Sequence, residues 1–356
     1  MSVVFYCLAS RDVLALFYMQ LSYSFIIPVY NRPDEVAELL ASFNQQETAI
    51  PYEIVIIEDG SSIPCKEVID AYPDLDITYL TKPNSGPGSS RNYGMERARG
   101  NYFIILDSDC MLPPQYVEVM DKKLKEQYVD CFGGPDAAHP DFSNLQKAIS
   151  YSMTSFFTTG GIRGGSEDAG KFQPRSFNMG LSKKAFQASK GFGDIHPGED
   201  PDLVLRLWDL GFKTALIPEA FVYHKRRISW KKFYTQVHKF GLVRPILNLW
   251  HPSTAKLTFW FPTLFIIGLV ASLMIGLLGN TILLKLYALY VAIIFVHSSI
   301  INKSLMIGCL SIVATGIQFY GYGTGFLSST IAVKWLRQLP RKRYPHLFFS
   351  TLETQK

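Results

Sequence analysis

Three long apolar stretches in the last third of the chain constrain its fold more than any other feature. They run from Leu257 to Gly279, from Thr281 to Ile301 and from Ser304 to Val333, and Lys285 is the only Lys, Arg, Asp or Glu within them. A helix rises about 1.5 Å per residue, so each stretch can cross a hydrocarbon core about 30 Å thick. A buried core helix is the alternative, but globular helices of this length usually need a polar face. The sequence therefore predicts a membrane protein whose soluble part comes first.

The basic residues around these stretches predict the side of the membrane that they face. One group follows the last stretch and another precedes the first: Lys334, Arg337, Arg341, Lys342 and Arg343, and Lys225, Arg226, Arg227, Lys231 and Lys232. Basic flanks favour the cytoplasmic leaflet, and three full crossings would put the two groups on opposite sides. The third stretch contains G-Y-G-T-G at 321–325. We therefore expect it to be re-entrant or interfacial, which leaves two spans and a cytosolic tail.

Composition narrows the partners and the compartment. The net charge of +5 is modest, and the aromatic residues near the basic groups lie at the expected membrane edge, so a nucleic-acid partner is not expected. Cys7, Cys65, Cys110, Cys131 and Cys309 form no close pair, which argues against a disulfide framework or a zinc site. A reducing cytosol fits the soluble part.

The first residues of the chain do not match a targeting segment. Their apolar run carries Arg11 and Asp12 in its middle, has no basic start and shows no small-residue cleavage site. We expect residues 1–22 to be an extension, with Met1 or Met19 as the functional start.

From Tyr23 onward the pattern alternates between strand and helix. Apolar runs at 24–31, 52–62 and 77–80 predict strands, and the segments 34–45, 65–71 and the one through Arg99 predict helices between them. A further buried strand is expected in N-Y-F-I-I-L-D-S-D at 101–109. This order predicts an α/β domain with a mainly parallel sheet and right-handed crossovers.

Carboxylates follow two of these expected strands. Asp107 and Asp109 are two positions apart, so on a strand they point the same way and could hold a divalent cation against phosphate oxygens. Glu58 and Asp59 end the earlier strand, at the same edge of a parallel sheet, where nucleotides bind. Turn formation explains each pair equally well, and the residues alone leave both readings open.

Other motifs offer phosphate-binding and acid–base groups. The stretch N-S-G-P-G-S-S-R at 84–91 offers backbone N–H groups at a helix start and the cation of Arg91. Glu199 and Asp200 precede an amphipathic helix, where they could cap the helix or act as a general base. His224 ends an apolar strand, where an imidazole is either structural or a metal ligand.

Taken in order, these motifs resemble the family 2 glycosyltransferases, which are nucleotide-sugar enzymes of the Rossmann-like GT-A fold. The resemblance covers about Ser24 to Gly241. It is carried by F-I-I-P-V-Y-N-R at 25–32, E-D-G-S at 58–61, N-S-G-P-G-S-S-R-N-Y-G at 84–94, D-S-D at 107–109, G-E-D at 198–200 and Y-H at 223–224.

The resemblance implies a role for each matching residue. Pro28, Tyr30, Glu58 and Asp59 would line the pocket for the nucleobase and ribose, and Arg91 and Asp107 would lie beside the nucleotide. Asp107 and Asp109 would hold Mg²⁺ or Mn²⁺ against the diphosphate, with His224 as a possible third ligand. Asp200, with Glu199 beside it, would take the proton from the acceptor hydroxyl. A single base with no carboxylate nucleophile implies inversion at the sugar carbon.

Two departures from the family pattern matter. Glu58 stands where the family often has aspartate, so Asp59 is the stronger candidate. Q-V-H-K-F at 236–240 replaces the Q-x-x-R-W of processive members, and Lys239 cannot copy the planar fork of arginine. The longer run Q-V-H-K-F-G-x-x-R followed by W-H-P is similar to that of single-addition, membrane-bound members of exopolysaccharide or cell-envelope assembly.

The expected protein is an inverting, metal-dependent glycosyltransferase of bacterial polysaccharide or cell-envelope biosynthesis. It would move a sugar from a UDP- or GDP-sugar to a lipid-linked or membrane-proximal glycan. A processive polysaccharide synthase and a noncatalytic membrane-anchored nucleotide-binding module are the alternatives. We expect a catalytic domain at 23–241 on the cytoplasmic side of the inner or plasma membrane. An interfacial linker at 242–256, two or three membrane helices at 257–333 and a basic tail at 334–356 would follow.

Overall fold

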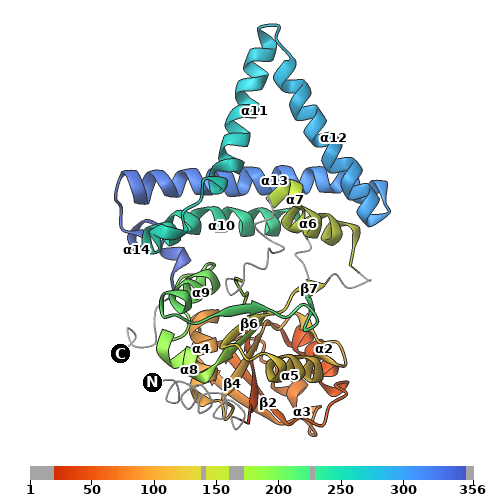
Figure 1. The fold of residues 1–356 in the computed structure, drawn as a ribbon, viewed down its shortest axis with the longest axis vertical. Coiled ribbons are helices and arrows are strands. Elements are labelled where there is room, and N and C mark those ends of the chain that lie inside the picture. The colour runs from red at the N-terminus through yellow and green to blue at the C-terminus, as the bar shows by residue number, and fades with distance from the viewer. Residues whose placement is uncertain (1–19, 138–141, 160–171, 225–228, 350–356) are drawn as a thin grey trace, which may run out of the picture.

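The computed structural model describes residues 20–137, 142–159, 172–224 and 229–349. It consists of a globular α/β domain, a layer of long helices laid across that domain, and a helical hairpin that rises from the layer (Figure 1). Most of the expected extension at 1–22, the basic residues Lys225, Arg226 and Arg227, and the tail at 350–356 lie outside the described residues.

A seven-stranded sheet forms the centre of the globular domain. Its order is β3-β2-β1-β4-β8-β6-β9. The strands are β1 (Tyr23–Val29), β2 (Tyr52–Asp59), β3 (Ile77–Lys82), β4 (Tyr102–Leu106), β6 (Cys131–Gly133), β8 (Asn178–Ser182) and β9 (Thr214–Leu216). The first four are parallel, as the alternating pattern predicts, whereas β8 runs antiparallel to both of its neighbours. The prediction of a mainly parallel α/β domain is confirmed.

Helices cover both faces of this sheet. One face is covered by α2 (Pro33–Asn44), α3 (Lys66–Asp70) and α5 (Tyr116–Glu126), and the other by α4 (Pro87–Arg97), α8 (Lys183–Ser189) and α9 (Glu199–Asp209). Phe25 and Ile27 of β1 belong to the first core and Ile26 to the second, because strand side chains alternate between faces. Burying a side chain of this size contributes about 1.5–3 kcal/mol, so two filled cores hold the sheet between the helices.

A second sheet of three short strands lies at one edge of the domain. Its order is β5-β10-β7, with β5 at Cys110–Met111, β7 at Asp136–Ala137 and β10 at Val222–His224. β10 pairs antiparallel with β5, and this register places His224 opposite Cys110. Two segments more than a hundred residues apart in sequence are joined here.

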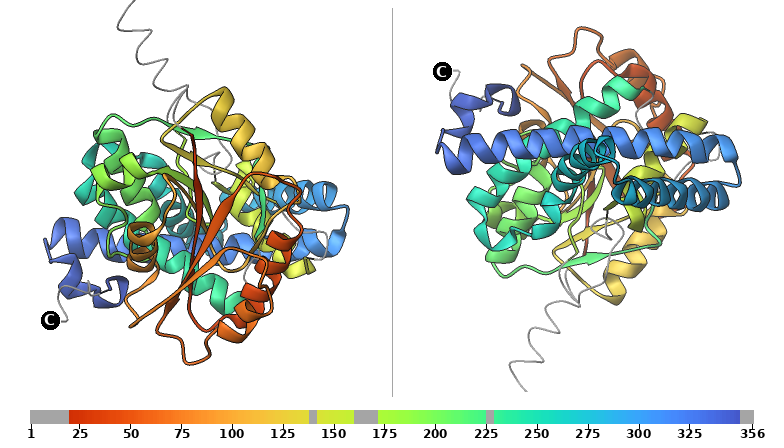
Figure 2. Two further views of the ribbon diagram at one scale, coloured as in Figure 1. Left: turned by 90° about the horizontal axis from the view of Figure 1, so that it is seen from below. Right: turned by 90° about the horizontal axis from the view of Figure 1, so that it is seen from above.

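Two long helices form most of the layer above the globular domain. They are α10 (Trp230–Trp250) and α13 (Leu305–Ser329), which lie side by side with α6 (Asn144–Thr154) and α7 (Phe156–Thr159) at one end (Figures 1 and 2). Glycines set their spacing: a Cβ on Gly241 would lie 2.3 Å from the carbonyl oxygen of Tyr322, and one on Gly325 would lie 2.5 Å from that of His238. The glycines of 321–325 therefore allow close helix packing and do not interrupt α13.

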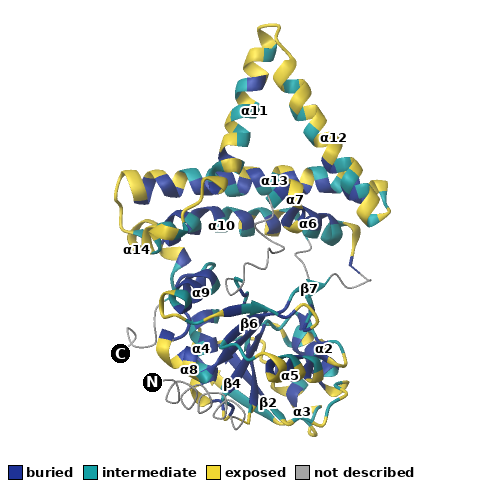
Figure 3. Ribbon diagram, in the orientation of Figure 1, coloured by how far each residue is buried: buried dark blue, intermediate teal, exposed yellow. Residues whose placement is uncertain are grey.

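The hairpin consists of α11 (Phe261–Leu277) and α12 (Ile282–Asn302). Three segments are long and apolar enough to cross a membrane, namely Leu257–Leu277, Ile282–Asn302 and Leu305–Trp335. They differ in their surroundings: in the most apolar part of each segment, the buried share is 11% for the first two and 39% for the third. α11 and α12 expose most of their surface, whereas α13 lies across the base of the hairpin with one side against α10 (Figure 3).

After α13 the chain returns to the globular domain. It passes through η3 (Thr330–Trp335), α14 (Pro340–Arg343) and η4 (Pro345–Leu347), and η1 (Pro252–Thr254) and η2 (Leu257–Trp260) join α10 to α11. The His196 N–H donates to the Leu347 carbonyl at 2.8 Å, and Arg341 forms an ion pair with Asp194. The end of the described chain therefore lies on the same side of the helical layer as the globular domain.

Candidate active site

A cavity of about 2290 Å³ joins the globular domain to the helical layer. On the globular side it is lined by Arg91, Asp107, Asp109, Arg175, Glu199, Asp200 and His224. On the other side it is lined by residues of α10, of η2 and the start of α11, and of α13. Single-ligand pockets usually measure about 300–1,000 Å³, so this cavity has room for two ligands.

The two aspartates of D-S-D lie in a turn. β4 ends at Leu106, and the Cys110 N–H donates to the Asp107 carbonyl at 3.2 Å, which closes a tight turn before β5. The prediction that strand alternation points Asp107 and Asp109 the same way is therefore wrong. The Asp107 carboxylate accepts a hydrogen bond from Arg91 at 2.7 Å, whereas that of Asp109 lies 3.1 Å from Nε2 of His224. Both still line the cavity.

Asp109 and His224 form the part of the site that fits a divalent cation. Their ligand atoms and Sγ of Cys110 all lie within 4.8 Å of one another, and Asp107 is not in this group. The Cys110 thiol donates to the Phe177 carbonyl at 3.3 Å, and burial raises the pKa of Cys110, so it remains a neutral thiol and a poor ligand. A carboxylate with an imidazole suits Mn²⁺ better than Mg²⁺, which prefers oxygen ligands throughout.

Arg91 connects the D-S-D turn to the start of α9. It is buried, and it donates to Asp107 and, at 3.3 Å, to Oε1 of Glu199. Burial opposes the charged form, but Asp107, Asp200 and Glu199 outweigh burial and raise the pKa of Arg91. Nδ1 of His196 lies 2.8 Å from the same Glu199 oxygen. Arg91 is thus held by protein carboxylates, and contact with a nucleotide stays a prediction for it.

Glu199 and Asp200 are adjacent, but their surroundings shift their pKa values in opposite directions. Burial raises the pKa of Glu199, but His196 and Arg91 more than offset burial and lower it to about 2. Burial, and then the negative charge of Glu199, raise the pKa of Asp200. Oδ2 of Asp200 accepts the Ser176 N–H at 3.1 Å, while Oδ1 has no hydrogen-bond partner among the described residues. Asp200 is therefore the better proton acceptor of the pair.

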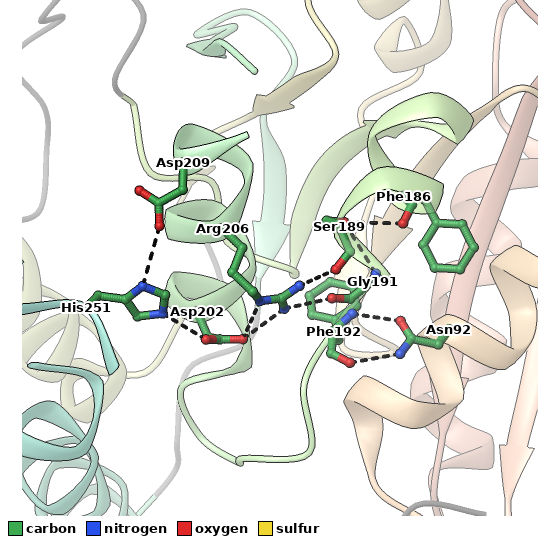
Figure 4. Close-up of polar contacts among 9 residues, drawn as sticks. All are labelled: Asn92, Phe186, Ser189, Gly191, Phe192, Asp202, Arg206, Asp209 and His251. Carbon is green, nitrogen blue, oxygen red and sulfur yellow. Dashed lines mark hydrogen bonds and ion pairs between the residues drawn. The ribbon is translucent and has the colours of Figure 1, made fainter. Parts of the chain in front are cut away.

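A network of polar contacts fixes the position of α9 (Figure 4). Asp202 accepts from Arg206 at 2.8 Å, and its other oxygen lies 3.0 Å from Nε2 of His251, which follows α10. Arg206 also donates to the Gly191 carbonyl at 2.7 Å. Asn92 of α4 exchanges two hydrogen bonds with the backbone of Phe192. These contacts tie the helix that carries Asp200 to both α4 and the helical layer.

The residues expected around the nucleobase lie elsewhere. Pro28, Tyr30, Glu58 and Asp59 do not line the cavity in the part of the chain that the structure describes. The Glu58 carboxylate accepts the Cys65 N–H at 2.9 Å and the Tyr79 hydroxyl at 3.0 Å. Asp59 accepts the N–H groups that lead into α4 and pairs with buried Lys82. These two carboxylates hold local structure, and the nucleotide role of all four residues stays a prediction.

Sequence reasoning gave no role to three residues of this site. His196 lies against Glu199, and Arg175 and Arg244 line the cavity. Arg244 ends the run Q-V-H-K-F-G-x-x-R and His196 stands two residues before G-E-D, whereas Arg175 belongs to none of the motifs that carry the resemblance. Their place in the cavity could not be read from the sequence, because an isolated cation in a loop or on a helix is usually solvated.

The globular domain is similar in sequence to known glycosyltransferases. Residues 24–187 match the family model described as Glycosyl transferase family 2. The chain is 36% identical over 105 residues to the uncharacterized glycosyltransferase YwdF of Bacillus subtilis, covering 29% of this chain and 38% of the relative. It is 35% identical over 107 residues to Glycosyltransferase GlyA of Streptococcus pneumoniae, covering 30% and 15%. The chain thus spans less than two fifths of either relative.

The fold is similar to that of a solved glycosyltransferase. The mannosyltransferase PcManGT from Pyrobaculum calidifontis, solved in complex with GDP-Man and Mn²⁺, superposes with a TM-score of 0.51 over 93% of this chain and 95% of that chain. Sequence identity is 14%, so the likeness concerns the fold. The globular domain is a mostly parallel, GT-A-like α/β domain followed by three helices long enough to span a membrane. Glu199, Asp200 and His224 lie beyond the matched residues 24–187.

Proposed function

We propose that this chain, which carries a family 2 glycosyltransferase domain, is an inverting enzyme that moves a sugar from a UDP- or GDP-sugar to a lipid-linked or membrane-proximal glycan. The process served would be polysaccharide or cell-envelope biosynthesis. One observation carries the proposal: a single cavity contains Asp109, His224 and Asp200 and extends to the start of the membrane hairpin. Donor, acceptor and reaction centre can meet there. The GDP-Man and Mn²⁺ of PcManGT support a nucleotide-sugar donor and a divalent cation.

The proposed chemistry assigns one task to each group. Asp109 and His224 would hold Mn²⁺ or Mg²⁺, which when bound stabilises the negative charge that develops on the departing nucleoside diphosphate. Asp200 accepts the proton of the acceptor hydroxyl while the oxygen of that hydroxyl bonds to the anomeric carbon. The bond from that carbon to the phosphate oxygen breaks, and its electron pair leaves with the nucleoside diphosphate. A single displacement on one face inverts the anomeric configuration.

The two alternatives explain less of the structure. A processive synthase needs a channel for a growing polymer, whereas two of the three apolar helices here form a hairpin and the third lies across its base. A noncatalytic module gives no reason for the buried Oδ1 of Asp200, which has no hydrogen-bond partner among the described residues. Burying a polar atom without a hydrogen bond destabilises the folded protein, and such atoms occur preferentially at catalytic sites.

Assay of the purified protein in detergent tests the function directly. With Mn²⁺, a panel of UDP- and GDP-sugars and a lipid-linked saccharide acceptor, we expect one donor to release nucleoside diphosphate faster when acceptor is present. The anomeric configuration of the product, read by NMR, should be opposite to that of the donor. Retention of configuration would exclude the single displacement, and no acceptor-dependent release with any donor would exclude the transferase.

The arrangement of helices leads to a prediction about membrane topology. We expect two crossings, with the catalytic domain and residue 342 both in the cytosol, because the segment after α13 packs on the catalytic domain. In a cysteine-free background, Asn280→Cys marks the tip of the hairpin and Lys342→Cys marks α14; both positions are exposed. A membrane-impermeant maleimide should label Asn280→Cys in intact cells, and Lys342→Cys only after the cells are opened. Labelling of Lys342→Cys in intact cells would instead indicate three crossings.

A further inference from the structure

Two arginines line the cavity, one from the globular domain and one from the helical layer. Arg175 lies in the loop before β8, and Arg244 lies on α10. The Arg244 guanidinium packs over the ring of Phe259, 4.5 Å from its centroid, and is hydrogen-bonded to Tyr322 of α13. Arg244 thus sits where α10, α13 and the segment leading into α11 meet.

The positive charge of this pair is poorly compensated. Burial lowers the pKa of Arg175; the charges of Asp200 and, more weakly, Glu199 oppose that change, and the charge of Arg244 adds to it. Burial also lowers the pKa of Arg244, where Tyr322 has a smaller, opposite effect. Within the described residues, neither guanidinium forms an ion pair with a carboxylate, and Arg175 makes no side-chain hydrogen bond. Two partly buried cations of this kind favour an anionic ligand.

The fork geometry of arginine points to the chemistry of that ligand. A guanidinium matches phosphate oxygens with two parallel hydrogen bonds, which are stronger than those between neutral groups. Arg91, the other arginine that reaches the catalytic carboxylates, is occupied by Asp107 and Glu199. Arg175 and Arg244 therefore remain available for a phosphate.

The surroundings of Arg244 indicate what the phosphate is attached to. Beyond Arg244 the cavity is lined by Leu257, Phe261 and Leu264, which begin the first membrane stretch. Leu257 is 89% exposed and Leu264 is 59% exposed, so an apolar chain has surface to follow out of the cavity into the bilayer. The donor diphosphate would instead belong near Asp109 and His224.

We propose that Arg175 and Arg244 bind the phosphate or diphosphate of a lipid-linked acceptor, whose apolar chain lies along the start of α11. This rests on the proposed function and assigns the acceptor class. Arg175 is close enough to Asp200 for their charges to interact. The phosphate and the hydroxyl that Asp200 deprotonates are therefore separated by a short saccharide.

Binding to farnesyl diphosphate in detergent tests this site without any sugar transfer. The variants are Arg175→Gln and Arg244→Gln, and Arg97→Gln is the matched control because Arg97 is exposed on α4 outside the cavity. We expect wild type and Arg97→Gln to bind equally, and each cavity variant to bind about 10-fold or more weakly, the scale of a lost hydrogen bond to a charged group. Arg244→Lys should recover part of the affinity.

Three further ligands distinguish binding through the phosphate, binding through the apolar chain and binding at the donor site. Farnesol lacks the phosphate, inorganic diphosphate lacks the chain, and UDP or GDP with Mn²⁺ reports the donor site. We expect farnesol and inorganic diphosphate to bind wild type more weakly than farnesyl diphosphate, and nucleotide affinity to be equal in all variants. Equal binding of farnesol, or an equal loss of nucleotide binding in the Arg→Gln variants, overturns the proposal.

Failure of this proposal can be distinguished from failure of the proposed function. If transfer occurs but the arginine variants bind farnesyl diphosphate as wild type does, the acceptor site is wrong and the transferase stands. If selective lipid-phosphate binding holds and no donor supports transfer, the site stands and the function fails. Thermal midpoints of unfolding, measured for every variant, detect misfolding. Gln should not lower them, because it removes a partly buried and poorly compensated charge.

Discussion

Replacement of Asp109 with alanine is expected to abolish sugar transfer and to weaken nucleotide binding in the presence of Mn²⁺. The carboxylate lies 3.1 Å from Nε2 of His224 and lines the cavity, so its loss removes half of the proposed cation-binding pair. A bound cation contributes several kcal/mol to stabilising the leaving-group charge, so turnover should fall by about 10³-fold or more. Nucleoside diphosphate release and nucleotide affinity, each measured with and without Mn²⁺, check this result.

The fold should tolerate this change. Asp109 lies in an open turn at the cavity, and its side chain is 20% exposed, so alanine leaves no deep cavity in the core. Asp74→Ala is the matched control, because Asp74 is exposed and lies outside the site. It should keep wild-type turnover and Mn²⁺ dependence. Wild-type turnover by Asp109→Ala would exclude Asp109 from cation binding.

The sequence predicted the order and the type of the first elements because their signals are local. Ile26 and its neighbours in β1 form a short apolar run, which is typical of a strand buried on both faces. The helix expected at 34–45 is observed at Pro33–Asn44. The expected strand at 52–62 ends earlier, at Asp59, because Gly60 adopts a φ of +72° and turns the chain. Local pattern thus located elements well and their ends less well.

The geometry of the site depends on contacts between distant segments. His224 reaches Asp109 only because β10 pairs with β5, and no local pattern specifies that pairing. Glu199 and Asp200 are equivalent in the sequence, yet only Glu199 contacts both Arg91 and His196. The pKa difference that distinguishes a fixed anion from a proton acceptor therefore arises in the folded protein.

The third apolar stretch shows the same limit for the membrane part. Hydropathy places Leu305–Trp335 with the other two segments, since composition records only how apolar a helix is. Its neighbours are determined by shape: Gly321 and Gly325 meet α10, and Gly323 meets the start of α11, at distances that a larger side chain would not allow. Two sequence signals indicate that this stretch differs: the conflict between basic flanks and three crossings, and the glycines of 321–325.

Replacement of Asp200 with asparagine should separate chemistry from binding and from stability. Asparagine has the same shape and can still accept the Ser176 N–H, but it cannot accept a proton. Turnover should fall by about 10²-fold or more, the usual contribution of a positioned base, while the Kd for the donor is unchanged. Equal losses of donor affinity and of turnover would place Asp200 in the donor site instead.

Stability should respond in the opposite direction to activity. The folded-state pKa of Asp200 is raised, so its ionised form is disfavoured by folding, and this cost is present at pH values above that pKa. Asparagine removes the charge, so the thermal midpoint at neutral pH should be equal to or above that of wild type. Asp202→Asn, on the same helix as Asp200, is the contrast: it weakens the contacts of Asp202 to Arg206 and to His251, and should lower the midpoint while most turnover remains.

The pH dependence of kcat/KM completes the test. Because a base must be ionised, wild-type activity should fall as the pH falls through the pKa of Asp200, which lies above that of an ordinary aspartate. Glu199, with a pKa of about 2, stays ionised over the same range and cannot produce this loss. The residual activity of Asp200→Asn should therefore lack the acid limb that both wild type and Asp202→Asn show. An unchanged acid limb in Asp200→Asn would assign the proton transfer to another group.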